Sequence, residues 1–297
     1  MPYTVYCMTS VAVVLAGGRS SRMGTAKAAL EWHGSTLLRH VTGVVGRAVD
    51  GPVIVVRAPG QKLPDVDPGV LVHEDPEEGL GPMQGLAVGL SAAAEHATSA
   101  FVCSTDLPFL HSAFVSAVLR GFEPDTGTTQ EEQRFDVVLP FVRGYRQPLV
   151  AGYRTNLAPR INRLLAAGRR RPAHLFEECR VRQLDDAALL SDQRLSVADP
   201  GLDSVVNVNE PADYDAARRR PAPEVVVQRY GVLATRGSRR GPLKIRAASV
   251  GAAAEQVGLS LNGHILAALN GDQIRGDGQV PLVAGDTVAF LSADAGG

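Results

Sequence analysis

Short apolar runs alternate with helical patterns over most of the chain, and this alternation limits the fold more than any other feature. Strands are expected at residues 11–15, 53–56, 70–72, 100–105 and 136–139. Helices are expected at residues 37–49, 85–94, 114–119, 156–167 and 173–179. Apolar runs that end at Gly or Pro are typical of parallel strands buried on both faces. Strands that alternate with helices predict βαβ units, and therefore an α/β fold in which a Rossmann-like, mostly parallel sheet carries helices on both faces.

The charge balance and the apolar content exclude several classes of protein. The 297 residues include 30 Lys and Arg against 31 Asp and Glu, a formal net charge of −1, which gives no general attraction to nucleic acid or to an anionic membrane. The apolar fraction of 45% excludes a disordered chain, and no stretch approaches the ~20 apolar residues of a membrane span. Three cysteines without CxxC spacing argue against a disulfide framework or a zinc site. We therefore expect a cytoplasmic protein that binds neither nucleic acid nor membrane.

The N-terminal residues carry no targeting pattern. The first ten residues contain no Lys or Arg, so they lack the charged start of a signal peptide. The first apolar run begins only at Val11, shortly after Met8. Translation is therefore expected to start at either Met1 or Met8.

The chain divides at a short basic stretch. At roughly 150 residues per domain, its length predicts two domains. Residues 218–223 read Arg-Arg-Arg-Pro-Ala-Pro, and such a charged, proline-bearing stretch is typical of an exposed linker. Beyond it, short strand patterns surround one helical turn at residues 252–257, which predicts a small α+β unit. The expected domains are therefore residues 1–217 and 224–297, joined by residues 218–223.

A glycine-rich loop with three cations follows the first expected strand. Residues 15–27 read LAGGRSSRMGTAK, with Gly17 and Gly18 at the carboxyl end of the strand. Glycines let backbone N–H groups turn toward a ligand, and Arg19, Arg22 and Lys27 add positive charge to the same loop. Ligands of open α/β sheets bind outside the carboxyl ends of the strands, so the loop predicts a phosphate site. Its spacing matches neither the dinucleotide fingerprint nor the P-loop, and an ordinary glycine turn with surface arginines is the alternative.

A single carboxylate stands at the end of the strand expected at residues 100–105. Asp106 follows this buried run, and Pro108 prevents the chain from continuing as a central strand. A carboxylate in this position is a hard oxygen ligand that suits Mg²⁺, an ion that also bridges to phosphates. The alternative is that Asp106 caps the N-terminus of the next helix, a position that Asp favours.

The glycine-rich loop, taken on through residue 30, resembles the signature of the molybdenum cofactor guanylyltransferases and their nucleotidyltransferase relatives. That pattern is Leu-Ala-Gly-Gly, a few residues, Arg-Met-Gly, and then Lys before a leucine. The resemblance covers about residues 11–217, and members often have Asp where this chain has Ala26. It implies that Lys27 binds the phosphates of the nucleotide. In the mechanism that we expect from it, Lys27, Arg22 and the Gly17 and Gly18 amides stabilise the departing pyrophosphate. It also implies that the nucleotide is lined by Leu15, Ala16, Gly17 and Gly18.

Four further segments resemble motifs of the same family. Asp-Leu-Pro at Asp106 is similar to its metal-binding Asp-x-Pro, which implies Mg²⁺ at this carboxylate. Residues 73–75 and 79–85 resemble a segment whose aspartate, here Asp75, contacts the nucleotide; a surface acid is the alternative. Residues 147–154 resemble a stretch on the acceptor side. Residues 206–211 resemble a closing Asn-x-Asn-x-Pro motif and imply that Asn209 lies in the active site; the alternative is that Asn207 and Asn209 cap the helix that begins near Pro211.

The resemblance implies transfer of GMP from GTP to a molybdopterin-type acceptor, with release of pyrophosphate and with Mg²⁺ as the cofactor. The second pKa of a phosphate monoester is about 6, so such an acceptor is already mostly a dianion and needs no general base. Catalysis then consists of positioning and charge neutralisation, with direct attack at the α-phosphorus. Many guanylyltransferases have a nucleotide-holding asparagine after the second strand, and residues 56–59 contain none. A cytidylyltransferase or another nucleotidyltransferase of the same fold is therefore the alternative.

The chain ends on two glycines, which can present a bare carboxylate to a partner enzyme but also occur in frayed termini. Residues 267–271 and 281–291 resemble the ubiquitin-like sulfur carriers, above all the small subunit of molybdopterin synthase, with the thiamine sulfur carrier as a close alternative. This resemblance covers about residues 223–297 and implies a β-grasp fold in which Gly297 is adenylylated and converted to a thiocarboxylate.

The two resemblances together define the expected partners. They are GTP, molybdopterin, an adenylating or sulfur-transfer enzyme, and the large subunit of molybdopterin synthase. The leading interpretation is a guanylyltransferase fused to a sulfur-carrier domain. An alternative from another class is a sulfur-carrier protein whose N-terminal half binds nucleotide without turnover.

Overall fold

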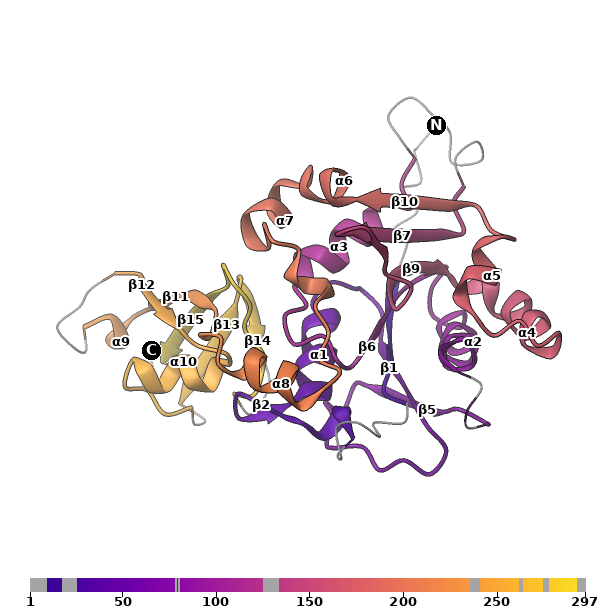
Figure 1. Cartoon of the computed structure of the whole chain (residues 1–297). Helices are drawn as coiled ribbons and strands as arrows, with labels where there is room; N and C mark the ends of the chain where they lie inside the picture. The colour runs from indigo at the N-terminus through magenta and orange to yellow at the C-terminus, as the bar shows by residue number, and fades with distance from the viewer. Residues whose placement is uncertain are drawn as a thin grey trace, which may run out of the picture. The chain divides into compact units, whose positions relative to one another are not determined.

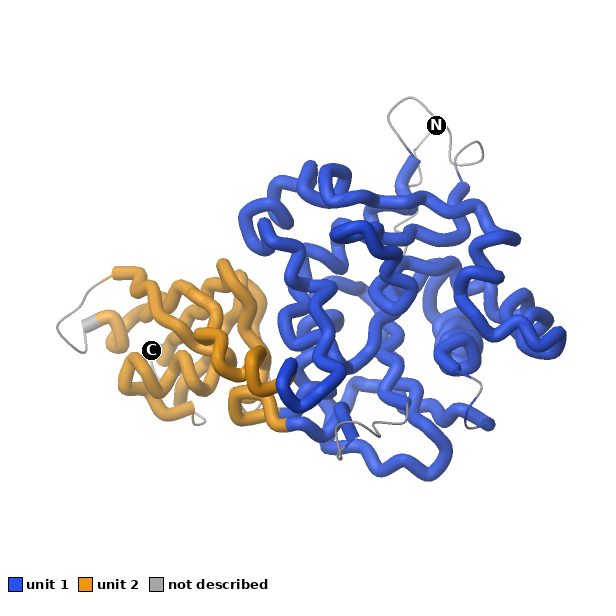
Figure 2. The backbone as a smooth tube through the Cα atoms, in the orientation of Figure 1, with its two compact units in different colours: residues 1–30, 36–213 blue, residues 31–35, 214–297 orange. Residues whose placement is uncertain are grey.

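The computed structural model describes residues 10–17, 26–77, 79, 81–124, 134–235, 241–261, 264–274 and 278–292. The chain forms two compact units (Figure 2): residues 1–30 with 36–213, called unit 1, and residues 31–35 with 214–297, called unit 2. Both expected start positions, Met1 and Met8, lie outside the described residues. No helix in the described part of the chain has the length and apolar content that crossing a bilayer requires.

Unit 1 is built around one sheet, which has eight strands within the described residues. The sheet order is β10-β7-β9-β6-β1-β4-β5, and β8 pairs with β7. The strands are β1 (Ser10–Leu15), β4 (Val53–Arg57), β5 (Leu71–Glu74), β6 (Ser99–Ser104), β7 (Val137–Val142), β8 (Tyr145–Arg146), β9 (Val150–Arg154) and β10 (Val181–Asp185). Strand β1 runs parallel to β4 and β6, and only β8 and β9 pair antiparallel to their neighbours. The expected mostly parallel α/β sheet is therefore confirmed for this unit.

Helices cover both faces of this sheet (Figure 1). Helices α1 (Leu37–Gly46) and α3 (Ser112–Arg120) pack together on one face, and α2 (Pro82–Ala93) and α4 (Ala158–Ala166) on the other. Helix α1 begins after Thr36, whose hydroxyl accepts from the Arg39 amide, and α2 begins with Pro82, a residue favoured in the first helical turn. The shorter elements of the unit are the helical turns η1 (Lys27–Ala29), η2 (Thr155–Leu157) and η3 (Asp203–Val205), and the helices α5 (Pro172–Phe176), α6 (Asp186–Leu190) and α7 (Gln193–Ala198). Helix α8 (Pro211–Arg218) spans the boundary between the units.

Helix α2 approaches the central strand very closely, because two of its inward positions are glycines. Every residue of β1 is buried, and Val13 points at α2. A Cβ atom on Gly89 would overlap the Cγ1 atom of Val13, whereas one on Gly85 would lie at ordinary contact distance, 3.4 Å, from Leu15. Each Å² of apolar surface that this packing removes from water contributes about 25 cal/mol of transfer free energy. The close contact between α2 and β1 therefore stabilises the whole sheet.

We expect Gly89→Ala to lower the free energy of unfolding by about 1–3 kcal/mol, because the added methyl group overpacks a rigid β-branched neighbour. Gly85→Ala in the same helix is the matched control. It should leave stability unchanged or raise it by up to about 1 kcal/mol, since alanine favours a helix over glycine. Denaturant unfolding of the two variants measures both values; equal stabilities would contradict the packing described here.

Unit 2 contains a second, mixed sheet in the order β12-β11-β15-β13-β14, counted over the described residues. Strand β11 is antiparallel to β12 and parallel to β15, and β13 is antiparallel to both β15 and β14. Helix α10 (Val250–Gln256) follows β12 and packs on the sheet around the buried Phe290. Its other elements are β2 (Glu31–Trp32), β11 (Glu224–Arg229), α9 (Val232–Thr235), β12 (Leu243–Arg246), β13 (Ile265–Leu269), β14 (Asp272–Ile274) and β15 (Thr287–Ser292). Strand β2 pairs with β3 (Ser35–Thr36), which spans the boundary between the units. Asn270 and Gly271, an expected turn, join β13 to β14 with positive φ angles of 53° and 100°.

Candidate active site

A pocket of about 390 Å³ lies where β1 and β6 end, at the carboxyl edge of the unit 1 sheet. This is the edge at which open α/β sheets bind their ligands. Side chains and backbone from five separate segments line the pocket. They are residues 15–17, residue 27, residues 104–107, residues 147–150, and residues 205, 207 and 209.

Three of the predicted site residues that line this pocket are hydrogen-bonded to one another. The Lys27 Nζ atom donates hydrogen bonds of 2.8 Å to Asp106 Oδ2 and of 2.8 Å to Asn209 Oδ1. The Lys27 and Asp106 side chains are 20% and 13% exposed, so this ion pair is only partly screened by water. One cation, one carboxylate and one amide oxygen therefore converge from sequence positions that are far apart. Their catalytic roles stay predictions.

Asp106 is fixed in place by two further contacts. Ser104 donates its hydroxyl to Asp106 Oδ1, and the Asp106 carbonyl accepts from the Val208 amide at 2.9 Å. The second contact ties the end of β6 to the segment that carries Asn209. Helix α3 begins only at Ser112, and its N-cap is His111, so Asp106 does not cap that helix. Ser104 belongs to no sequence motif, so this contact could not be predicted from the sequence.

The Asn209 side chain faces Lys27 rather than the helix that follows. The Asn209 and Glu210 amides donate to Asp213 Oδ2 at 3.1 and 3.0 Å, so Asp213 satisfies the first amides before α8. The Asn209 side chain is thereby left to accept from the ammonium group of Lys27. Asn207 also lines the pocket.

The first two residues after β1, Ala16 and Gly17, are held in place by backbone hydrogen bonds. The Ala16 and Gly17 amides donate to the Val56 carbonyl at 2.8 and 3.2 Å, so in this structure the Gly17 amide bonds within the protein. A Cβ on Gly17 would lie 3.0 Å from the Ala58 nitrogen, which explains why this close approach requires glycine. Leu15 is nearly buried and lines the same pocket.

Gln61 holds this loop in place, a role that no sequence pattern predicted. Its Nε2 atom donates to the Ala16 carbonyl at 3.0 Å, and its Oε1 atom accepts from the Ala58 amide at 2.9 Å. Arg57 in turn donates to the Gln61 carbonyl at 3.0 Å. Gln61 follows strand β4, in the region where many guanylyltransferases have a nucleotide-holding asparagine and this chain has none.

The segment expected on the acceptor side also lines the pocket. Residues 147–150 contribute to the lining. The fully buried Tyr153 donates its hydroxyl to the Pro148 carbonyl at 2.7 Å, and burial raises the pKa of this hydroxyl well above its ordinary value. This side chain therefore supports the wall without facing the pocket.

Asp75 lies at the carboxyl end of β5, outside the lining of the pocket. Its Oδ1 atom accepts from the Glu77 amide at 3.2 Å, and burial raises the pKa of its carboxyl group more than this hydrogen bond lowers it. An ideal Cβ at Gly85 would lie 3.4 Å from Leu15 and 4.0 Å from Asp75 Oδ2, so Asp75 lies near the wall of the pocket. Contact between Asp75 and a nucleotide stays a prediction. Gly18, Arg19, Arg22 and Gly297, which the sequence also singled out, lie outside the described residues.

The oxygen atoms at this site fit a hard cation. Among the described residues, no group of three or more His, Cys, Asp or Glu is arranged to hold a metal ion. Mg²⁺ does not need one, because it binds one or two carboxylates and completes its shell with water and substrate phosphates. The Lys27 ammonium already occupies a position between the Asp106 and Asn209 oxygens, so this position accepts positive charge.

Comparisons with known proteins agree with this fold. Residues 12–185 match the family described as "MobA-like NTP transferase domain". A crystal structure of molybdopterin-guanine dinucleotide biosynthesis protein A from Archaeoglobus fulgidus aligns with a TM-score of 0.53 at 21% identity, covering 70% of this chain and 96% of that chain. The fold and the family match together define an enzyme of the nucleotidyltransferase class.

The names of similar proteins specify the family more closely. A protein of Mycobacterium ulcerans is 38% identical over 211 residues, which are 70% of this chain and 92% of the relative. A protein of Mycobacterium tuberculosis (strain H37Rv) is 40% identical over 168 residues, 56% of this chain and 78% of the relative. Both are named probable molybdenum cofactor guanylyltransferase. The chain belongs to this family of MobA-like nucleotidyltransferases, as the glycine-rich loop predicted.

Proposed function

We propose that the enzyme transfers GMP from GTP to a molybdopterin-type phosphate monoester and releases pyrophosphate. The observation that carries the proposal is the convergence of Lys27, Asp106 and Asn209 beside the loop at residues 15–17. The names of the curated relatives support GTP as the donor and the molybdenum cofactor as the acceptor.

The residues of the pocket suit a reaction between two anions. Among the described lining residues none is a histidine, and an acceptor that is already a dianion near neutral pH needs no general base. Asp106 and Asn209 would hold Mg²⁺, which supplies charge neutralisation to the phosphates when it is bound. Lys27 binds and orients the phosphates of the nucleotide, and its ammonium stabilises the charge that develops on the departing pyrophosphate. Arg22 is proposed to share this role.

Nucleotide-dependent release of pyrophosphate tests the proposal. The full chain is incubated with molybdopterin, Mg²⁺ and either GTP or CTP. We expect release with GTP and inversion at the α-phosphorus of a chiral α-phosphorothioate, because attack is direct. A preference for CTP would support the cytidylyltransferase alternative. Binding of nucleotide without any release of pyrophosphate would overturn the proposed activity and favour the carrier protein with an inactive N-terminal half.

We also propose that unit 2 is a β-grasp, ubiquitin-like sulfur carrier. Its strand order, with the first and last strands parallel at the centre and α10 after the first hairpin, supports this proposal. Strand β15 ends at Ser292, shortly before Gly297 in the sequence. Its partners would be an adenylating or sulfur-transfer enzyme and the large subunit of molybdopterin synthase. The domain boundary is proposed at residues 218–223, which run from the last residue of α8 to the residue before β11.

Deleting Gly297 should abolish sulfur loading and leave pyrophosphate release from GTP unchanged, because the carboxylate that accepts sulfur is lost while unit 1 is intact. Mass spectrometry after incubation with an adenylating enzyme and a sulfur donor detects the exchange of one oxygen for sulfur. A tag added at the C-terminus should have the same effect, and the same tag at the N-terminus is the matched control. Loading of the deletion variant at the normal level would exclude the carrier function.

The thiols support the cytoplasmic location that we propose. Cys103 is buried and Cys179 is half-buried, and within the described part of the chain both are free thiols. Burial raises the pKa of each thiol, which keeps both protonated and unreactive. Free thiols of this kind are typical of a reducing compartment.

A further inference from the structure

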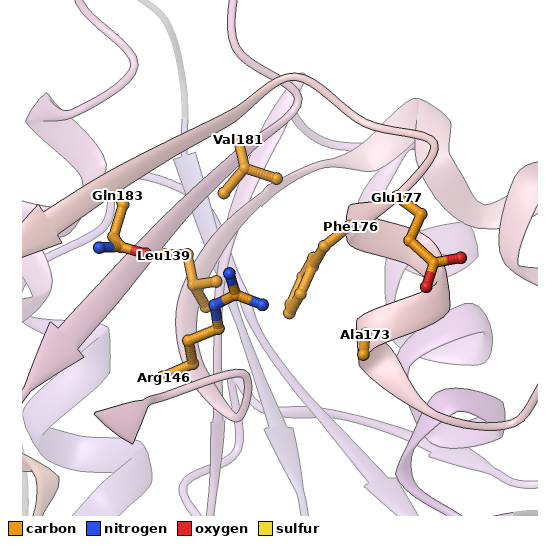
Figure 3. Close-up of a pocket in the computed structure, with 7 residues that line it drawn as sticks. All are labelled: Leu139, Arg146, Ala173, Phe176, Glu177, Val181 and Gln183. Atoms are coloured by element: carbon orange, nitrogen blue, oxygen red, sulfur yellow. The ribbon is translucent and has the colours of Figure 1, made fainter. Parts of the chain in front are cut away.

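A second pocket of unit 1 lies between the outer strands of the sheet and helix α5 (Figure 3). Its volume is about 370 Å³, within the range of small-molecule sites. Strands β7, β8 and β10 and helix α5 supply its lining, and none of these residues lines the candidate active site. The pocket is therefore a separate recess with its own chemistry.

The inner surface of this pocket is apolar and partly aromatic. Leu139 of β7 is buried, and Val181 of β10 and Phe176 of α5 are half-buried around it. The parallel register of β7 and β10 pairs Leu139 with Gln183, so the two residues stand at the same level of the sheet. A phenyl ring beside an aliphatic wall favours a flat, apolar ligand surface.

Two polar side chains border this apolar surface. Arg146 of β8 and Gln183 of β10 are exposed, and the part of the chain that the structure describes offers neither side chain a hydrogen-bond or ion-pair partner. Figure 3 shows the Arg146 guanidinium pointing toward the Phe176 ring. The nearby carboxylate of Glu177 is paired with Arg169, so it does not neutralise Arg146.

This combination selects a class of ligand. A fused, planar heterocycle can stack on Phe176 and receive hydrogen bonds from the planar guanidinium, which itself stacks on ring systems. The Gln183 amide both donates and accepts, so it matches a ring edge that carries an N–H group beside a carbonyl group. A pterin has these features.

The sheet order sets the distance between the two pockets. Strands β7 and β10 are two and three positions from β6, and neighbouring strands lie about 4.8 Å apart. This recess therefore begins about 10 Å from β6, the strand that ends just before Asp106. Arg146 directly precedes Gln147, which lines the candidate active site. One molecule with a phosphate at one end and a fused ring at the other can therefore occupy both pockets.

We infer that the pocket of Arg146, Phe176 and Gln183 binds the pterin ring of the acceptor while the phosphate of that acceptor lies at the candidate active site. The inference rests on the proposed function, because it assigns the distal part of the proposed acceptor. It makes Arg146 and Gln183 specificity-determining residues for the acceptor, with no part in nucleotide binding.

Binding of 6-hydroxymethylpterin, which has the ring and no phosphate, tests the inference on the full chain. Quenching of the fluorescence of the pterin measures its Kd. Arg146→Ala and Gln183→Ala should each weaken binding about tenfold or more, and Arg146→Lys should recover only part of the loss because it lacks the planar fork. Both positions are exposed, so these variants should fold. Tyr145→Ala is the matched control, since Tyr145 is the neighbour of Arg146 on β8, is 74% exposed and does not line the pocket.

Steady-state kinetics separates this inference from the proposed function. In Arg146→Ala we expect the KM for the acceptor to rise about tenfold or more, with the KM for GTP unchanged. Pterin binding by Arg146→Ala and Gln183→Ala at the wild-type Kd would overturn the inference, as would displacement of the pterin by GTP. Either result leaves the release of pyrophosphate from GTP intact, whereas failure of the proposed function removes that release from the unmodified enzyme.

Discussion

Replacing Asp106 with alanine should reduce pyrophosphate release at least about 10³-fold, because removal of a single charge-stabilising group from a catalytic site typically costs 10²–10³-fold and this carboxylate also holds Lys27. The loss should appear mainly in kcat. Asp106→Asn keeps the shape of the side chain and removes its charge, and we expect a loss of similar size. Steady-state release of pyrophosphate from GTP measures both variants. Thermal unfolding should show only a small change, about 1 kcal/mol, because the ion pair with Lys27 is partly solvated.

The control for Asp106 is a carboxylate in an ion pair elsewhere on unit 1. Asp67 pairs with Arg39 at 3.0 Å and is half exposed, and Asp67→Asn should leave turnover unchanged. Activity of Asp106→Ala within tenfold of the wild type, with Mg²⁺ dependence retained, would show that Asp106 neither binds the metal nor organises the site.

Replacing Lys27 with methionine should raise the KM for GTP and lower kcat, with a combined loss of about 10²–10³-fold in kcat/KM. The methionine keeps the length of the side chain but cannot stabilise phosphate charge. Lys27→Arg should recover little, because a planar guanidinium cannot reproduce the point charge of an ammonium between Asp106 and Asn209. The exposed Lys62 is the matched control, and Lys62→Met should behave as the wild type.

The same variant gives a result that does not depend on turnover. In the nucleotide-free enzyme the Lys27 ammonium competes with any metal ion for the oxygens of Asp106 and Asn209. Lys27→Met should therefore bind Mn²⁺, used as a spectroscopic probe, more tightly than the wild type before GTP is added. Weaker Mn²⁺ binding together with an unchanged KM for GTP would show that Lys27 neither competes with the metal ion nor binds the nucleotide.

Much of the fold of unit 1 could be predicted because its buried strands have continuous apolar sequences. Strands β1 and β6 lie within one residue of their expected bounds, since parallel strands covered on both faces need apolar residues throughout. Strand β9 was not expected, because Gly152 and Arg154 interrupt its pattern. The structure explains the glycine: a Cβ there would lie 2.8 Å from the Phe122 ring. Tertiary packing therefore selected a residue that weakens the local strand signal.

The candidate site could be predicted in part. The residues that came from long motifs, Lys27, Asp106 and Asn209, do meet in one pocket. Ser104 and Gln61 could not be found in this way, because their roles depend on contacts made after folding. Gln61 bonds to a residue 45 positions away and carries no local pattern.

The second pocket had no signal in the sequence for the same reason. Its polar residues, Arg146 and Gln183, come from two strands that were not expected, β8 and β10. Their position beside Phe176 follows from the order of strands in the sheet, which apolar periodicity does not determine.

A crystal structure of the enzyme with GTP and Mg²⁺ tests the central claim most directly. We predict that the triphosphate lies along residues 15–17, that the metal ion binds Asp106, and that the Lys27 ammonium has moved from Asp106 to the phosphates. A triphosphate bound elsewhere on the chain, or a Lys27 that still pairs with Asp106 while nucleotide and metal are bound, would contradict it.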